Sequence, residues 1–168
     1  TNTYMDSQND LKFILATIHR SENINSQSKL INIFKNLDQI HNEINVIMPL
    51  HPHTKKKMEH FSINSNIKFI EPVGYLSLLS LLKNCDQVIT DSGGLQKESY
   101  FAKKKCITVR AETEWTELTK QAQNVLCEPK DIYKEFKKKI QSKKEFNSNI
   151  YGDGNSCKVI VDSIVNFF

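Results

Sequence analysis

Short apolar runs alternate along the chain with segments whose apolar residues recur at helical spacing, and this alternation constrains the fold most. The runs are apolar on both faces and rich in β-branched residues, which is typical of central strands in a covered parallel sheet. They span residues 13–17, 44–50, 67–70, 87–90, 106–110 and 124–127. Helices are expected at 29–41, 76–83, 95–103, 131–141 and 155–168. This order predicts an open α/β sheet of about six parallel strands with helices on both faces.

Length and composition indicate one soluble domain. A chain of 168 residues, with 39% hydrophobic and 25% charged residues, is expected to fold around one core with no linker. The longest apolar run, at 75–82, is too short to cross a bilayer, so no membrane partner is expected. Residues 1–10 are polar and lack the basic start and apolar stretch of a signal peptide. A cytoplasmic location is therefore expected.

The cysteines favour reduced thiols. They have no CxxC spacing and no histidine placed to complete a zinc site, and they lie at positions 85, 106, 127 and 157. We therefore expect neither a disulfide framework nor a metal.

The basic residues give two further expectations. The net charge of +4 comes mainly from separated lysine runs at 55–57, 103–105 and 137–139, without interleaved aromatic residues, so no nucleic-acid partner is expected. Only two of the 23 lysines and arginines are arginines, Arg20 and Arg110. This bias favours a role for both as planar, forked donors, which an ammonium group cannot imitate.

Polar motifs follow four of the expected strands, where ligands bind in open α/β sheets. In TDSGGLQKE, residues 90–98, the glycines Gly93 and Gly94 open a helix whose unpaired N–H groups and dipole favour phosphate oxygens without a metal. Ser92 adds a hydroxyl, and Glu98 is placed to reach a ribose diol. The alternative is that Ser92 is only an N-cap and the glycines form a tight turn.

Two further motifs contain one arginine each. In TIHRSEN, residues 17–23, the pair His19 and Arg20 is suited to bind an anion or to move a proton near neutral pH. Alternatively, His19 caps a loop and Glu22 opens the following helix. RAETEWTE, residues 110–117, is suited to recognise sugar hydroxyls and a diphosphate, with Arg110 as the charge partner, or is a solvated helix start.

The fourth motif, PLHPH at 49–53, resembles a metal pair only superficially. Two prolines constrain the loop that carries His51 and His53, and no third ligand is evident. We expect no metal there, and His51 is a candidate substrate-binding residue.

Together, the motifs resemble the C-terminal half of the non-hydrolysing UDP-N-acetylglucosamine 2-epimerases. HRSEN is similar to that family's H-R-x-E-N, TDSGGLQKE to T-D-S-G-G-x-Q-x-E, and RAETEWTE to R-x-x-T-E-x-x-E. YGDG at 151–154 matches the Y-G-D-G that precedes the last helix. The matches occur in the same order across almost the whole chain.

The resemblance implies a GT-B-type enzyme whose two Rossmann-like halves close over a UDP-sugar, with residues 1–168 as the UDP-binding half. By position, Ser92 and Gly94 would contact phosphate, with Gly93 between them in the substrate site. Three further residues would contact the ribose hydroxyls, the uracil (through its backbone) and the diphosphate, and these are Glu98, Leu78 and Arg110.

His19 would lie beside the leaving UDP and assist catalysis. Arg20 and Glu22, with His19, match positions that contact a second UDP-sugar in allosterically regulated relatives. Family enzymes eliminate UDP to leave an unsaturated 2-acetamidoglucal and add it back after C2 inverts, which converts UDP-GlcNAc to UDP-ManNAc. No cofactor is implied.

The carboxyl groups that move the C2 proton belong to the family's N-terminal domain, which this chain does not include. The isolated chain is therefore expected to bind UDP weakly and not to epimerise a UDP-sugar. The resemblance implies a full-length homodimer and a role in precursor synthesis for surface polysaccharides or glycans. Trp115 and Thr116 stand where many bacterial members carry arginine and proline, so the resemblance does not determine which UDP-sugar is the substrate or whether the enzyme is regulated. Alternatives are an epimerase for another UDP-sugar, such as a diacetamido uronic acid, half of a GT-B glycosyltransferase, and a noncatalytic UDP-sugar-binding module.

Overall fold

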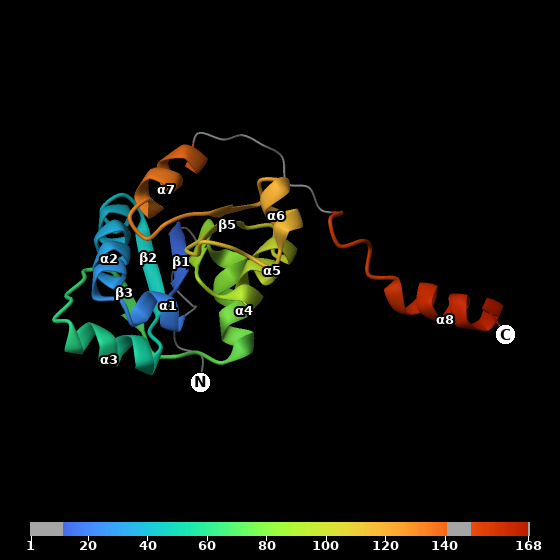
Figure 1. Ribbon diagram of the computed structural model, residues 1–168, viewed down its shortest axis with the longest axis horizontal. Helices are drawn as coiled ribbons and strands as arrows, with labels where there is room; N and C mark the ends of the chain where they lie inside the picture. Colours follow the sequence, from blue (N-terminus) through green and yellow to red (C-terminus); the bar gives the residue numbers. More distant parts are fainter. Residues whose placement is uncertain (1–11, 141–148, 168) are drawn as a thin grey trace.

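The expected strands all form, and they join one parallel sheet in the order β3-β2-β1-β4-β5-β6 (Figure 1). The computed structural model describes residues 12–140 and 149–167. Residues 1–10, on which the expectation about a signal peptide depends, lie outside this described part, as do residues 141 and 168 at the ends of two expected helices. The strands are β1 (Phe13–Thr17), β2 (Asn45–Pro49), β3 (Lys68–Ile70), β4 (Gln87–Thr90), β5 (Lys105–Thr108) and β6 (Asn124–Leu126).

Helices follow the strands as the sequence predicts, with three additions. The predicted ones are α2 (Gln27–His41), α4 (Tyr75–Asn84), α5 (Gly93–Phe101), α7 (Ile132–Ile140) and α8 (Ser156–Phe167). The additions are α1 (Ser21–Ile24), α3 (Pro52–His60) and α6 (Thr116–Lys120). The sequence pattern did not indicate α3 because only Thr54 and Met58 of its residues are buried, so it lacks an apolar stripe.

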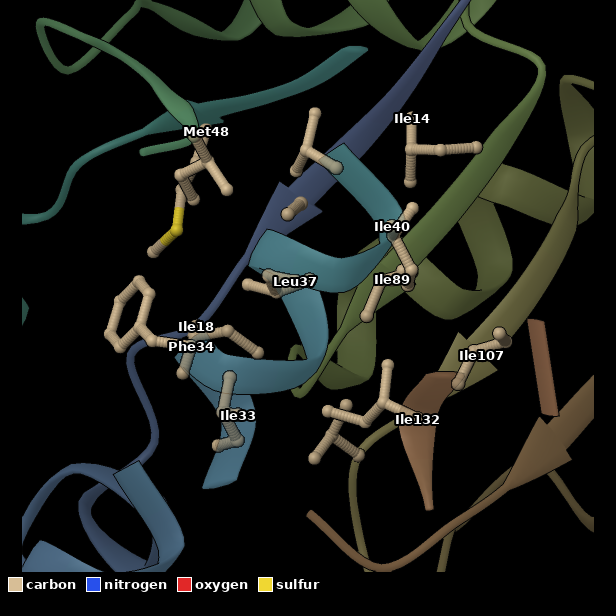
Figure 2. Packing of buried hydrophobic residues seen from close by; sticks show 14 of the residues in the cluster. Ile14, Ile18, Ile33, Phe34, Leu37, Ile40, Met48, Ile89, Ile107 and Ile132 are labelled. Carbon is tan, nitrogen blue, oxygen red and sulfur yellow. The ribbon is translucent and has the colours of Figure 1, made fainter. Parts of the chain in front are cut away.

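Alternate strand residues pack on opposite faces of the sheet, as expected for a sheet covered on both sides. On one face, Ile14, Ile89 and Ile107 pack with buried residues of α2 and α7. Figure 2 shows this face, with Ile33, Leu37 and Ile40 of α2 among its core side chains. On the other face, Leu15, Val88 and Cys106 pack with Leu82 of α4 and Leu95 of α5. Each fully buried leucine or isoleucine contributes about 1.5–3 kcal/mol of hydrophobic free energy.

The order of the strands reverses between β1 and β4, which lie side by side in the middle of the sheet. Leu15 pairs with Ile47 of β2 on one side and with Val88 of β4 on the other. Successive strands thus build outward from β1 in one direction and from β4 in the other. In open α/β sheets this reversal is the place where ligands bind, at the carboxyl ends of the two strands.

Helix α8 stands apart from the sheet and its covering helices (Figure 1). None of its residues is buried. Several of its side chains are large, apolar and exposed, namely Val159, Ile160, Val161, Ile164, Val165 and Phe167. Within residues 12–140 and 149–167, no helix combines the length and apolar character that a bilayer span requires.

Candidate functional site

The carboxylate of Asp91 holds the loop after β1 against the loop after β4. Its oxygens accept hydrogen bonds from the backbone amides of His19 and Arg20, each at 3.0 Å. The ring Nδ1 of His19 lies 3.6 Å from Asp91 Oδ1. Asp91 is completely buried. Because a buried carboxylate needs several donors to offset its desolvation, these contacts fix the backbone of both loops.

Asn23 extends this network to the loop after β5. Its side-chain amide donates to Asp91 Oδ2 and to the backbone carbonyl of Val109, each at 3.0 Å. The Thr17 and Thr90 hydroxyls at the ends of β1 and β4 are hydrogen-bonded at 2.6 Å. The motifs that follow β1, β4 and β5 are therefore joined at one edge of the sheet, although they are far apart in sequence.

Helix α5 begins at this edge, and Ser92 is its N-cap. The Ser92 hydroxyl accepts a hydrogen bond from the Leu95 amide at 3.4 Å, as the simpler interpretation of this motif predicted. The glycines do not form a left-handed turn, because they are the first two residues of the helix and neither has a positive φ. A Cβ atom added at Gly94 would meet nothing within 4 Å. Glu98 lies one turn further along the helix, on the same side as Gly94.

At Gly93 the space beside the backbone is occupied by the side chain of Glu114. A Cβ atom at Gly93 would overlap Glu114 Oε1 and lie 3.8 Å from Arg110 Nη1. Glu114 Oε2 accepts a hydrogen bond from Arg110 Nη1 at 2.7 Å. A hydrogen bond from its own backbone amide lowers the pKa of Glu114, and the guanidinium groups of Arg110 and Arg20 lower that pKa further. Both arginines thus act on the same carboxylate beside the first turn of α5.

Arg110 is the more buried partner of this ion pair. Its side chain is 10% exposed, against 46% for Glu114. Its Nε is buried and has no hydrogen-bond partner among the described residues. A buried guanidinium N–H without a partner is costly, and an oxyanion is the group that satisfies it best. Arg110 together with the first turn of α5 is therefore suited to bind an anion.

Side-chain hydrogen bonds attach the loop after β5, residues 110–115, to α5. Trp115 Nε1 donates to the Gly93 carbonyl oxygen at 2.8 Å, and the Thr113 hydroxyl bonds to Gln96 Oε1 at 2.7 Å. The Lys97 ammonium lies 4.3 Å from the Trp115 ring centroid and 4.4 Å from that of Tyr151. These cation–π contacts also bring the YGDG segment against the helix. The segment that follows β5 is thus fixed relative to the first turn of α5.

The structure also places the other predicted residues. His51 is the N-cap of α3, where its Nδ1 accepts from the His53 amide at 3.2 Å, and its ring lies 5.9 Å from that of His19. Glu22 lies in α1, with its carboxylate 3.2 Å from Arg20 Nε. Leu78 lies in α4, packed against the core, and its amide already donates to the Gly74 carbonyl oxygen. A uracil contact through the backbone of Leu78 stays a prediction.

Sequence reasoning missed two residues that organise the site. Asp91 lies in the TDSGGLQKE motif, and the signal that could have identified it is an acidic residue directly after a buried strand. Glu114 lies in the RAETEWTE motif, in which the sequence pattern indicated a specific role only for Arg110. Its contact with Gly93 could not be read from spacing, because it depends on the path of the loop after β5.

Comparisons with known proteins identify the family of the chain. A family model described as UDP-N-acetylglucosamine 2-epimerase matches residues 1–165. A UDP-N-acetylglucosamine 2-epimerase of Methanococcus maripaludis is 40% identical over 164 residues, which cover 91% of this chain and 44% of that protein. A UDP-2,3-diacetamido-2,3-dideoxy-D-glucuronate 2-epimerase of Pseudomonas aeruginosa is 44% identical over 115 residues, or 68% of this chain and 32% of that protein.

A solved structure of Methanocaldococcus jannaschii UDP-GlcNAc 2-epimerase in complex with UDP-GlcNAc and UDP has the same fold. It superposes with a TM-score of 0.77 at 34% identity, over 93% of this chain and 46% of that one. The predicted fold, half of a GT-B-type enzyme, is confirmed. The chain spans less than half the length of these relatives, and it belongs to the UDP-N-acetylglucosamine 2-epimerase family.

Proposed function

We propose that this chain is the UDP-binding half of a UDP-N-acetylglucosamine 2-epimerase and holds UDP at the carboxyl ends of β1, β4 and β5. The observation that carries the proposal is the state of Arg110. Its guanidinium is 10% exposed, its Nε has no partner among the described residues, and it lies beside the first turn of α5. A helix N-terminus next to a buried guanidinium offers both the N–H donors and the positive charge that a diphosphate requires.

Several of the predicted residues have a role in this proposal. Ser92 and Gly94 contact the diphosphate, because the helix begins there and the space beside Gly94 is open. Glu98, on the same side of α5, accepts hydrogen bonds from the ribose hydroxyls. His19 lies beside the leaving UDP, with its backbone held by Asp91. Arg20 contributes positive charge at the same edge, since it acts on the Glu114 carboxylate.

Epimerisation requires a second half that this chain does not contain. Removal and return of the C2 proton needs acidic groups on the other side of the sugar, and we assign them to the N-terminal domain. The exposed apolar residues of α8 indicate that another part of the complete protein covers this helix, since exposure of such a surface to water is unfavourable. We therefore propose that the isolated chain is inactive and that the complete protein is a homodimer. Its product would enter the synthesis of surface polysaccharides or glycans.

A second candidate substrate is a UDP-linked diacetamido uronic acid. The identity to the Pseudomonas aeruginosa relative, 44% over 115 residues, favours it. The nucleotide contacts proposed above would be the same for both sugars. Turnover assays of the complete protein with each UDP-sugar distinguish the two candidates.

Calorimetric titration with UDP tests the proposed site. Wild type is expected to bind UDP, and Glu98→Ala is expected to bind it about tenfold more weakly because one hydrogen-bonded ribose contact is lost. Glu59→Ala serves as a matched control, since Glu59 is an exposed glutamate on α3. Equal affinities of wild type and Glu98→Ala would contradict the ribose contact. No binding by wild type would contradict the proposed function itself.

A further inference from the structure

The Glu114 carboxylate stands between two groups that are suited to bind an anion. One is the Arg110 guanidinium, whose Nη1 donates to Glu114 Oε2 at 2.7 Å. The other is the first turn of α5, where Glu114 Oε1 fills the space that a Cβ atom at Gly93 would take. A carboxylate in this position presents the charge and the two oxygens of a phosphate group to the same partners.

We propose that Glu114 is an internal competitor of the diphosphate: its carboxylate occupies the place of one phosphate group and leaves when the nucleotide binds. This inference rests on the proposed function, because it requires a diphosphate at Arg110. Glu114 thereby lowers the affinity of the site and raises the concentration of UDP that is needed to occupy it.

The two partners of the ion pair differ in the way that such an exchange needs. The Glu114 side chain is 46% exposed, so rotation of its carboxylate into water disturbs few other contacts. The Arg110 side chain is 10% exposed and stays in place. Glu114 also leaves Arg110 incompletely satisfied, because the Nε atom has no partner among the described residues. A diphosphate carries enough oxygens to replace the carboxylate and to reach further donors.

Gly93 is explained by the same exchange. The absence of a side chain at this position leaves room for the Glu114 carboxylate. The same room is open to a phosphate oxygen once Glu114 has moved. The alternative is that Glu114 holds Arg110 in position for the nucleotide. The competitor and the positioning residue predict changes of opposite sign when the charge of Glu114 is removed.

Calorimetric titrations of the 168-residue chain with UDP, inorganic pyrophosphate and uridine separate these possibilities. The variants are Glu114→Gln, which keeps the shape of the side chain, and Glu114→Ala, which removes it. Glu112→Gln is the matched control, because Glu112 is an exposed glutamate of the same loop. Circular dichroism of each variant establishes that it is folded.

Both Glu114 variants are expected to bind UDP and pyrophosphate about three- to tenfold more tightly than wild type, since a competing ion pair of this exposure is removed. Glu112→Gln is expected to match wild type, and uridine binding is expected to be the same in all chains. UDP binding by wild type with unchanged or weaker binding by both Glu114 variants overturns the inference alone. No UDP binding by any chain overturns the proposed function and the inference with it.

Discussion

The carboxylate of Asp91 accepts hydrogen bonds from the backbone amides of both His19 and Arg20, which precede it by 72 and 71 residues. Asp91 therefore fixes the loop after β1 at the place where α5 begins. The side chains of His19 and Arg20 are 42% and 38% exposed, while the backbone amides of both residues are bound to Asp91. This arrangement separates the residue that positions the loop from the residues proposed to contact UDP.

Replacement of Asp91 by asparagine is expected to weaken the whole sheet edge. An asparagine would turn its NH₂ group or a weaker acceptor toward two backbone N–H donors, so the free energy of unfolding is expected to fall by about 1–3 kcal/mol. Urea denaturation of Asp91→Asn measures this change. Asp86→Asn is the control, because Asp86 is exposed in the loop before β4. Equal stability of Asp91→Asn and wild type would show that the buried network contributes little.

Gly94→Ala separates ligand binding from folding. A Cβ atom at this position meets nothing within 4 Å, and alanine stabilises a helix by about 0.5–1 kcal/mol relative to glycine. The variant is therefore expected to be at least as stable as wild type. Its affinity for UDP is expected to fall about tenfold or more, because the methyl group blocks the approach of phosphate to the first turn.

Fluorescence gives a direct measurement of this loss. The chain has one tryptophan, Trp115, and its indole Nε1 lies 2.8 Å from the carbonyl oxygen of Gly93. UDP is expected to change its emission in wild type at lower concentrations than in Gly94→Ala. Gly74→Ala, at another glycine with no neighbour within 4 Å, should titrate like wild type. An identical response of Gly94→Ala and wild type would place the phosphate elsewhere.

Thiol reactivity is expected to differ sharply between Cys157 and the other cysteines. Cys157 is exposed, whereas Cys85, Cys106 and Cys127 are buried. Burial raises the pKa of Cys85 to about 12, so its thiol stays protonated at pH 8. A chromogenic disulfide reagent at pH 8 should label one thiol in the native chain and four in denaturant. Rapid labelling of more than one native thiol would contradict the burial of the other three.

The same shift in Cys85 has a consequence for stability. Because the pKa is raised in the folded state, the contribution of Cys85 to folding is complete below the pKa of an exposed thiol, near 8.5. That contribution decreases as the pH rises from there toward 12. Cys85→Ser, whose hydroxyl does not ionise in this range, should lose less stability than wild type between pH 8 and pH 10.

Removal of α8 is expected to leave the domain folded. No residue of α8 is buried, so truncation before Ser156 should change the free energy of unfolding by less than about 0.5 kcal/mol. The truncated chain should also scatter less light at high concentration, because the exposed apolar side chains are gone. A large loss of stability on truncation would show that α8 packs against the sheet in solution.

Much of the fold could be predicted because the strands carry a strong local signal. Strands β1, β4 and β5 are buried on both faces, so most of their residues are apolar whichever side they point to, as Leu15 and Ala16 illustrate. The missed helices have the opposite property. Helix α3 has two buried residues and three consecutive lysines, and its start is indicated only by Pro52 after the His51 cap.

The site could be predicted only as a set of motifs. Their convergence follows from the rule that polar loops gather at the carboxyl ends of parallel strands. The contacts between them depend on long-range geometry. Asn23 reaches both Asp91 and the Val109 carbonyl oxygen, across 68 and 86 residues, and no local pattern contains that information. The occupation of the space beside Gly93 by Glu114 was missed for the same reason.

The hydrogen bond between the hydroxyls of Thr17 and Thr90 joins residues 73 positions apart, at the carboxyl ends of the two central strands. Contacts of such separation are slow to form, because the entropy of a long stretch of chain is lost when they close. A chain in which this contact has not formed would therefore lack the edge of the sheet where UDP is proposed to bind, even with individual helices in place. Any small molecule captured there would raise the melting temperature of the entire domain instead of protecting one loop.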